Sequence, residues 1–134
     1  MPHTIAKFGR YKLEHPDFPD MVISVTEVPP GLLAGDPIRE QFDDRSIDVG
    51  HSLGAIWFNV VDSSGAHVAT ATFAGDGLAA QCDTIDVESA YRRKRVASLL
   101  YLIASKIFAA PVVPSSNRSD DALAFWGDQT EISA

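Results

Sequence analysis

The sequence predicts a single α/β (α+β) domain built on a mixed, mostly antiparallel sheet flanked by helices. Its 134 residues suit one domain with one core. Apolar and polar residues alternate with the period of β-strands through much of residues 54–87. A segment with the apolar spacing of a helix packed on a sheet, residues 93–109, follows directly. No P-loop or Gly-x-Gly-x-x-Gly motif is present, so a doubly wound nucleotide fold is not predicted.

The N-terminal part predicts one strand and one short helix. Residues 1–20 contain Pro16 and Pro19, which disfavour a continuous helix, and they are interpreted as an N-terminal extension without an assigned structure. Residues 21–28, MVISVTEV, alternate and are rich in β-branched side chains, which predicts a strand. A short helix is predicted around PIREQF, because a proline suits the first helical turn.

Three antiparallel strands are predicted in the middle of the chain. Residues 54–62 and 66–75 flank the sequence SSG and predict a hairpin with a glycine-containing turn. The sequence GDG makes the next turn, and residues 78–87 predict the third strand. His67 alternates with the strand residues of the hairpin and is predicted to face solvent rather than to act in catalysis.

The C-terminal part predicts a long helix, a short strand and a second helix. The helix over 93–109 ends before Pro111, and the sequence PVVPS then predicts an extended segment. A further helix is predicted over 119–128, because Ser119 is a suitable N-cap and two aspartates follow in the first turn.

Composition excludes several classes of function. The net charge is −7, which argues against a general nucleic-acid-binding protein. The single cysteine, Cys82, cannot form an internal disulfide, and no Cys/His spacing predicts a metal site. No apolar run is long enough to span a bilayer, and the N-terminus has no hydrophobic signal region. A cytoplasmic location without membrane, metal or nucleic-acid partners is therefore expected.

Four consecutive basic residues stand at the start of the long predicted helix: Arg92, Arg93, Lys94 and Arg95. The N-terminus of a helix presents unpaired N–H groups and positive potential, which together form a site for anions such as a diphosphate. The alternative is a solvated charged face without a ligand. Basic side chains at this end oppose the helix dipole, which favours a reason for their presence.

The segment IDVESAYRRKRVASLLY, residues 85–101, resembles motif A of the GNAT superfamily of acyl-coenzyme A N-acyltransferases. Its matching positions, in register, are Ile85, Val87, Tyr91, Arg92 and Ala97. The resemblance covers roughly residues 21–126 and includes the order of the predicted elements. It implies a GNAT-like sheet that lacks the last two strands of a full-length member. The PVVPS edge is then open, and homodimerisation is one way to cover it.

The resemblance implies an N-acetyltransferase that uses acetyl-coenzyme A and no metal. The acceptor is an unidentified amine, either a small molecule or a protein lysine, which attacks the thioester directly. Main-chain groups of the motif strand at Ile85 and Val87 would pair with the pantetheine arm. The pyrophosphate would lie against the amides of Arg93, Lys94, Arg95, Ala97 and Ser98, with Arg92 as the leading motif residue.

Two positions depart from the family pattern. Arg95 occupies the place of a glycine, whose missing Cβ lets the backbone approach phosphate closely. Trp126 stands where the family has a tyrosine that protonates the leaving thiolate, and an indole is no acid near neutral pH. Trp126 is alternatively a core aromatic residue. These departures leave open a second function, a catalytically degenerate GNAT-like binding or regulatory module.

Asp83 is the candidate general base on the motif strand. Counting in steps of two places it on the face of Val87 and places Cys82 on the opposite face as a small buried thiol. The alternative for Asp83 is a carboxylate in solvent at the end of a strand.

Overall fold

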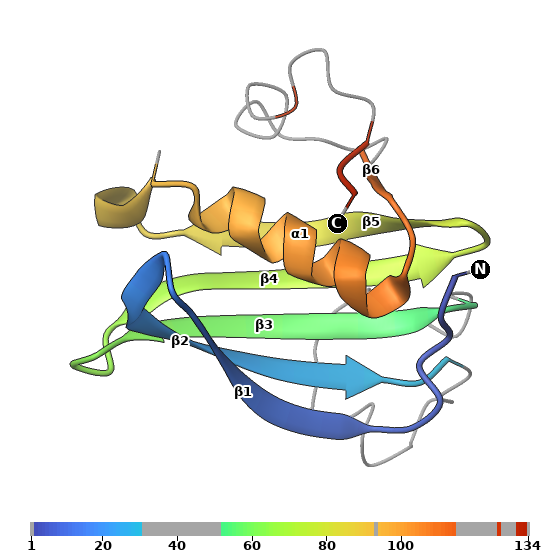
Figure 1. Cartoon of the computed structure of the whole chain (residues 1–134), viewed down its shortest axis with the longest axis horizontal. Helices are drawn as coiled ribbons and strands as arrows, with labels where there is room; N and C mark the ends of the chain where they lie inside the picture. The colour runs from blue at the N-terminus through green and yellow to red at the C-terminus, as the bar shows by residue number, and fades with distance from the viewer. Residues whose placement is uncertain (1, 31–51, 93, 115–125, 127–130, 134) are drawn as a thin grey trace.

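A computed structural model of the chain describes residues 2–30, 52–92, 94–114, 126 and 131–133. In these ranges a six-stranded sheet carries the helix α1, and its strands follow one another in chain order from β1 to β6 (Figure 1). The elements are β1 (Gly9–His15), β2 (Phe18–Val28), β3 (Gly54–Asp62), β4 (His67–Asp76), β5 (Ala79–Val87), the short 3-10 helix η3 (Ser89–Tyr91), α1 (Val96–Phe108) and β6 (Val112–Val113).

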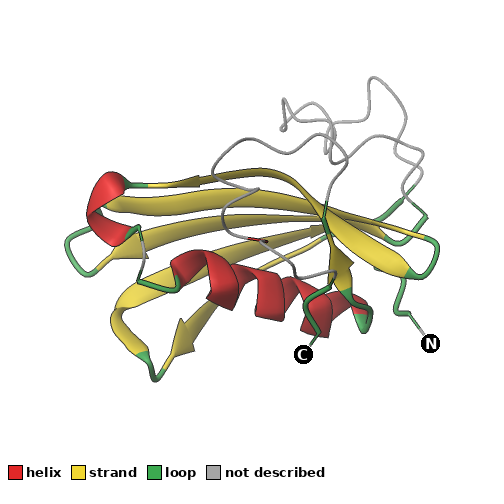
Figure 2. Ribbon diagram, turned by 90° about the horizontal axis from the view of Figure 1, so that it is seen from above, coloured by secondary structure: helices red, strands yellow, loops and turns green. Residues whose placement is uncertain are grey.

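The pairing confirms an α+β fold with a mostly antiparallel sheet. Neighbouring strands from β1 to β5 all run antiparallel, whereas β6 pairs in parallel with β5. A parallel pair needs a crossover, and α1 supplies it. Figure 2 shows α1 lying across one face of the twisted sheet. The predicted helices around PIREQF and over 119–128 fall, apart from Trp126, outside the described residues.

The N-terminal extension contains a strand that the sequence did not predict. Gly9–His15 forms β1, which pairs with β2 at the edge of the sheet. The strand β2 begins at Phe18, earlier than predicted, so Pro19 lies inside it. Proline is compatible with the start of a strand, where a missing N–H costs little. The prolines therefore excluded a helix correctly but did not exclude a sheet.

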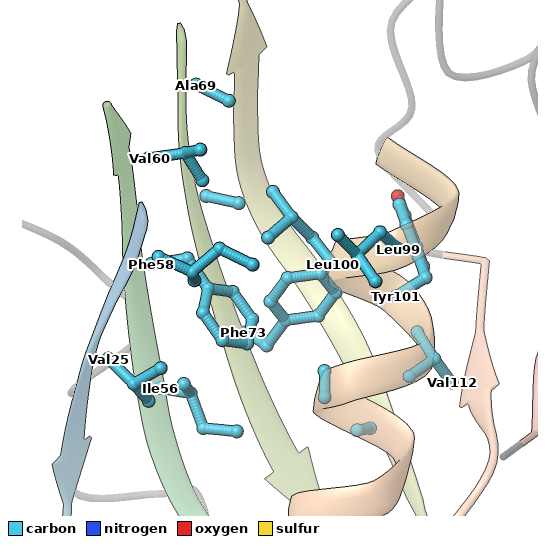
Figure 3. Packing of buried hydrophobic residues seen from close by; sticks show 14 of the residues in the cluster. Val25, Ile56, Phe58, Val60, Ala69, Phe73, Leu99, Leu100, Tyr101 and Val112 are labelled. Atoms are coloured by element: carbon cyan, nitrogen blue, oxygen red, sulfur yellow. The ribbon is translucent and has the colours of Figure 1, made fainter. Parts of the chain in front are cut away.

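The core lies between the sheet and α1. Alternate residues of β3 and β4 point to the helix, as the period of two requires. Phe58 and Phe73 meet edge to face, with ring centroids 5.6 Å apart, and both are fully buried. The helix contributes Leu100, which is also fully buried, and Tyr101, whose ring lies 5.2 Å from that of Phe73 (Figure 3). This packing fixes where α1 begins and ends relative to β5.

The turn between β3 and β4 is held by a carboxylate. Asp62 Oδ1 accepts hydrogen bonds from the main-chain N–H groups of Ser64 and Ala66, at 2.9 and 3.0 Å, and from the Ser64 hydroxyl at 2.6 Å. Gly65 adopts φ 87, a left-handed conformation that glycine reaches without a steric penalty. The predicted hairpin around SSG is confirmed.

Two β-bulges change which residues share a face. In β4, Val60 pairs with Ala69 and Val61 pairs with His67, so Val68 is an extra residue. In β5, Thr84 and Cys82 pair with consecutive residues of β4, so Asp83 is the extra residue between them. An extra residue in one strand shifts every later side chain by one position relative to simple alternation.

The bulge in β5 corrects the face assigned to Cys82. Cys82, Ile85 and Val87 all pack against the core beneath α1. The prediction that Cys82 lies opposite Val87 was therefore wrong, because counting in steps of two does not hold across Asp83. The same bulge removes the argument that placed Asp83 on the face of Val87.

The sheet edge at β6 is partly covered by the chain itself. Val112 and Ile132 exchange two main-chain hydrogen bonds of 2.8 Å as an isolated antiparallel bridge. The extended segment predicted as PVVPS is confirmed as a strand only at Val112–Val113. The edge was expected to be open, and the bridge to Ile132 corrects that expectation at Val112. Homodimerisation through this edge stays a prediction.

The N-terminal residues of the chain pack against the C-terminal end of α1. His3 N–H donates to the carbonyl of Phe108 at 2.6 Å, and Ile5 N–H donates to the carbonyl of Leu53 at 3.0 Å. The Ile5 side chain is buried in the core. Residues 2–5, called the N-terminal strap below, therefore belong to the packed domain.

Candidate functional site

The candidate site comprises the end of β5, the connection from β5 to α1 and the first turn of α1, which together contain the motif residues. The short helix η3 follows Glu88, and α1 begins at Val96 with Arg95 as its N-cap. The helix was predicted to begin near residue 93. Because it begins at Val96 instead, all four basic residues precede it in the sequence. Arg95 has φ 64 and ψ 17, which is the left-handed conformation. A non-glycine residue pays roughly 1–2 kcal/mol to adopt it.

The first turn of α1 has main-chain donors without a helical acceptor. The first bond of the helix runs from Leu99 N–H to the Arg95 carbonyl at 3.0 Å, so the N–H groups of Val96, Ala97 and Ser98 have no acceptor within the helix. The N-cap side chain makes no capping hydrogen bond, and no acidic residue lies in the first turn. This end of α1 therefore keeps its positive potential and its donors.

One predicted phosphate-binding amide is already used. The N–H of Lys94 points to the carbonyl of Tyr91 at 3.4 Å, a long bond that closes the turn after η3. The amide of Lys94 is therefore less available than those of Ala97 and Ser98. Arg93 lies outside the described residues.

Cationic side chains surround this end of the helix. Arg92 Nε donates to the carbonyl of Val87 at 3.1 Å and so bridges the end of β5. Lys94 Nζ lies over the ring of Tyr91, 5.4 Å from its centroid. Arg92, Lys94 and Arg95 are all exposed. The positions of these charges agree with an anion site, although the Arg92 contact was not predicted.

Tyr91 anchors the connection to the β3–β4 turn. Its hydroxyl donates to Asp62 Oδ2 at 3.4 Å. The hydroxyl of Ser64 and the other donors around the carboxylate hold the pKa of Asp62 below its ordinary value. Partial burial, and then the negative charge of Asp62, raise the pKa of the Tyr91 phenol, which keeps its proton. The motif tyrosine therefore has a positioning role in this structure.

Beyond residue 81, the described strands leave one side of β5 uncovered. The parallel pairing with β6 consists of Ala80 with Val112 and Gln81 with Val113. Among the described residues, no strand pairs with residues 82–87 on the side of β5 that faces away from β4. We call the main-chain groups on this side the β5 edge.

Ile85 and Val87 supply the polar groups of the β5 edge. The N–H of Glu88 donates to the carbonyl of Val68 in β4 at 2.9 Å. Residues of an antiparallel pair alternate between bonding to their partner and pointing away from it. The main-chain groups of Val87 and Ile85, one and three positions earlier, therefore point away from β4. These are the groups that the resemblance implies for coenzyme binding.

Asp83, the candidate base, is the extra residue of the bulge in β5. It lies two residues after Gln81, the last residue of β5 that pairs with β6, and therefore near the start of the β5 edge. Bulges re-aim side chains and end strand pairing. The orientation of the Asp83 side chain lies outside what the structure describes, so its role stays a prediction.

Trp126 lies in the core, 2% exposed, and its ring meets that of Tyr101 edge to face at 5.3 Å. Tyr101 was missed from the sequence, because its position in the helix indicated only core packing. Burial, and then Cys82 on β5, raise the pKa of Tyr101, while a hydrogen bond with Trp126 acts in the opposite direction. Tyr101 is therefore a protonated hydroxyl beside the strand that carries the β5 edge, and Figure 3 places it on the β6 side of α1.

Within the described ranges, no group of three or more histidine, cysteine, aspartate or glutamate side chains could hold a metal ion. None of the helices described there is long and apolar enough to cross a membrane. Comparisons with family models, curated proteins and solved structures found no match for this chain. The geometry of the site is therefore the basis for a functional proposal.

Proposed function

We propose that the chain is an N-acetyltransferase of GNAT type, which transfers an acetyl group from acetyl-coenzyme A to an amine, either a small molecule or a protein lysine. The observation that carries this proposal is the continuity of two sets of main-chain groups. The β5 edge at Ile85 and Val87 leads through η3 to the uncapped first turn of α1. An extended amide arm that ends in a diphosphate matches this sequence of groups.

The fold supports the same proposal. Antiparallel strands in chain order, a helical crossover and a parallel last pair occur here in the order that the resemblance implies. The bulge at Asp83 lies two residues after Gln81, where the β5–β6 pairing ends. Arg95 occupies the glycine position of the motif and adopts the left-handed conformation that glycine favours. Its backbone therefore keeps the conformation suited to that position.

Each part of the chain would then have a distinct task. The amides of Ala97 and Ser98, with the charges of Lys94 and Arg95, would hold the diphosphate. The bound acetyl-coenzyme A supplies an activated thioester. A site that holds the amine beside the thioester makes their reaction effectively unimolecular, which lowers the barrier. Asp83 is the candidate to accept the amine proton. Trp126 is buried against Tyr101, and its indole cannot supply a proton, so it takes no part in proton transfer.

A catalytically degenerate binding module is the second candidate, and one contact favours it. The Val87 carbonyl, which the pantetheine arm would need, already accepts a hydrogen bond from Arg92 Nε at 3.1 Å. Coenzyme binding through this carbonyl requires the Arg92 side chain to move. In the binding module, Arg92 stays in place and holds the connection closed.

A thermal-shift titration with coenzyme A and acetyl-coenzyme A tests coenzyme binding. A ligand that binds only the folded chain raises the free energy of unfolding, by about 2.7 kcal/mol at one hundred times Kd, and so raises the melting temperature. We expect a shift for the unmodified chain and none for the double variant Lys94→Glu/Arg95→Glu. The matched control Arg10→Glu/Lys12→Glu reverses two exposed charges on β1 and is expected to keep the shift. No shift at millimolar coenzyme refutes the acetyltransferase.

Release of free thiol from acetyl-coenzyme A in the presence of a panel of amines tests turnover. Acetylation of at least one amine, with loss in the Lys94→Glu/Arg95→Glu variant, supports the enzyme. A thermal shift together with no thiol release on any amine supports the binding module instead.

A further inference from the structure

A second group of reactive side chains lies on the sheet face opposite α1. The imidazole of His67 lies between two partners. Its Nδ1 is 2.8 Å from Glu88 Oε1, and its Nε2 is 2.7 Å from Thr70 Oγ1. The three residues come from the start of β4 and from the position after β5.

The carboxylate determines which nitrogen of the neutral imidazole carries the proton. An ionised glutamate oxygen accepts hydrogen bonds and donates none, so Nδ1 carries the hydrogen that it donates to Glu88. Nε2 then has a lone pair, and it accepts the hydroxyl hydrogen of Thr70. A hydroxyl bonded to a base that a third group orients is the arrangement of an activated nucleophile.

The β4 bulge brings His67 and Thr70 together. Residues three apart in a regular strand face opposite sides of a sheet. The extra residue Val68 restores His67 to the face of Thr70. His67 pairs with Val61 and Thr70 pairs with Asn59, so the two pairs are neighbours on β3. Simple alternation along β4 could not have predicted this contact.

The main chain holds Glu88 in place. Its N–H donates to the Val68 carbonyl at 2.9 Å, and its carbonyl accepts the Tyr91 N–H at 2.8 Å. Positions held in this way by neighbouring strands keep a side-chain geometry better than a free loop does. The His67 side chain is 37% exposed and that of Glu88 is 50% exposed, so a substrate can reach the group from solvent.

We propose that Thr70, His67 and Glu88 form a catalytic triad for activated acyl esters. Thr70 Oγ1 bonds to the ester carbonyl carbon while its proton passes to His67 Nε2. The bond from that carbon to the leaving alkoxide then breaks, and the alkoxide takes the proton from Nε2. Water attacks acyl-Thr70 in the same way and restores the hydroxyl, so the net reaction is hydrolysis of the ester. Glu88 is a positioning residue that orients the imidazole.

Asn59 lies beside the nucleophile. It pairs directly with Thr70 across β3 and β4 and is exposed. Directly opposed side chains have Cβ atoms about 4.5–5.5 Å apart. The Asn59 amide can therefore donate to an oxygen that becomes negative at the attacked carbonyl, a contribution of about 100- to 1,000-fold where such donors have been removed.

The test uses p-nitrophenyl acetate without coenzyme, so it is independent of the proposed acetyltransferase. We expect a burst of nitrophenol, and we expect peptide mapping of acid-quenched protein to place one acetyl group on Thr70. Thr70→Val is expected to lose both signals. His67→Gln is expected to lower the burst rate by about 100-fold or more. Glu88→Gln is expected to lower it as well, and Glu88→Asp to restore part of it, which loss of structure alone would not produce.

Two matched controls delete the same kinds of side-chain group, a hydroxyl and an imidazole, at positions outside the proposed triad. Thr84→Val deletes another strand hydroxyl, one that bonds to Thr72 at 2.7 Å instead of to an imidazole. His15→Gln removes an imidazole whose Nδ1 accepts a main-chain N–H. Both are expected to retain the burst and the Thr70 adduct.

The unmodified, folded chain decides the question even if a variant does not fold. Acetyl groups on lysine or Cys82 and none on Thr70 overturn the proposal. An equal extent of acetylation on Thr84 and Thr70 overturns it too, because it would show that strand threonines react without the imidazole.

Discussion

The two ends of α1 are built in opposite ways, although a left-handed residue flanks each. Ala109 has φ 49 at the C-terminal end, and Arg95 has φ 64 at the N-terminal end. At the C-terminal end, Ala110 N–H donates to the Ser105 carbonyl at 3.2 Å, and the N-terminal strap donates to the Phe108 carbonyl. The Ser105 hydroxyl adds a bond to the Ala110 carbonyl at 2.7 Å. This end is closed by packing and by hydrogen bonds.

The N-terminal end of α1 has none of these features. It has no side-chain cap and no acidic residue in the first turn, and exposed cations surround it. A helix selected for stability alone would carry Ser, Thr, Asp or Asn as its N-cap, which contributes about 1 kcal/mol. It would also carry acidic side chains in its first turn. The comparison teaches that the C-terminal end serves the fold, whereas the N-terminal end leaves donors without a helical acceptor, as the proposed coenzyme site requires.

The largest effect is expected from removing a side chain at the closed end. Phe108 is fully buried, so Phe108→Ala is expected to lower the free energy of unfolding by about 3–5 kcal/mol. Leu102→Ala on the same helix is the control, since Leu102 is 42% exposed, and it is expected to cost under about 1 kcal/mol. Urea unfolding measures both. Equal losses would contradict the assignment of the C-terminal end to the core.

A smaller effect of opposite sign is expected from glycine at the two left-handed positions. Relief of the left-handed strain exceeds the added chain entropy, so Ala109→Gly and Arg95→Gly are each expected to stabilise by roughly 0.5–1 kcal/mol. The two variants differ in the second readout. Only Arg95→Gly is expected to change the coenzyme-induced thermal shift, because it removes both a charge of the proposed diphosphate site and the Cβ that keeps phosphate from the backbone. A changed shift in Ala109→Gly would show that stability alone sets the signal.

The smallest effect concerns Asp62, which anchors Tyr91. The pKa of Asp62 lies below its ordinary value of 3.8 in the folded chain. The ionised Asp62 carboxylate therefore stabilises the folded chain fully at pH values well above 3.8. This stabilisation is lost as the pH falls below 3.8 and through the lower pKa of the folded state. Asp62→Asn is expected to melt lower than the unmodified chain near neutral pH, with a difference that shrinks in acid. Asp17→Asn, at a side chain 82% exposed, is the control and is expected to show no such trend.

Local patterns predicted those parts of the fold that depend on neighbouring residues. Apolar runs bounded by turn residues predicted β3, β4 and β5, and all three strands contribute side chains to one core. Helical spacing predicted α1, and Pro111 marked its end. The cationic segment at residues 92–95 marked the N-terminal end of this helix. Each of these signals lies within one element, so a single sequence is enough to read it.

Features that depend on two strands at once could not be predicted. The bulges at Val68 and Asp83 are properties of register, and nothing in VAT or CDT distinguishes a bulged strand from a regular one. They altered the face of Cys82 and brought His67 to Thr70. The left-handed conformation of Arg95 had no signal of its own, because arginine does not favour it. The strand β1 was missed because its pairing with β2, rather than its own sequence pattern, stabilises it.

The N-terminal strap has a consequence for the order of events during synthesis. His3 and Ile5 leave the ribosome before the rest of this domain, yet the partner of His3, the Phe108 carbonyl, emerges about a hundred residues later. The antiparallel strands can associate as hairpins while translation continues, whereas closure at the strap waits for α1. Contacts of such long sequence separation slow folding. Docking of the strap on the last turn of α1 is therefore a late step, which cannot precede the synthesis of that turn.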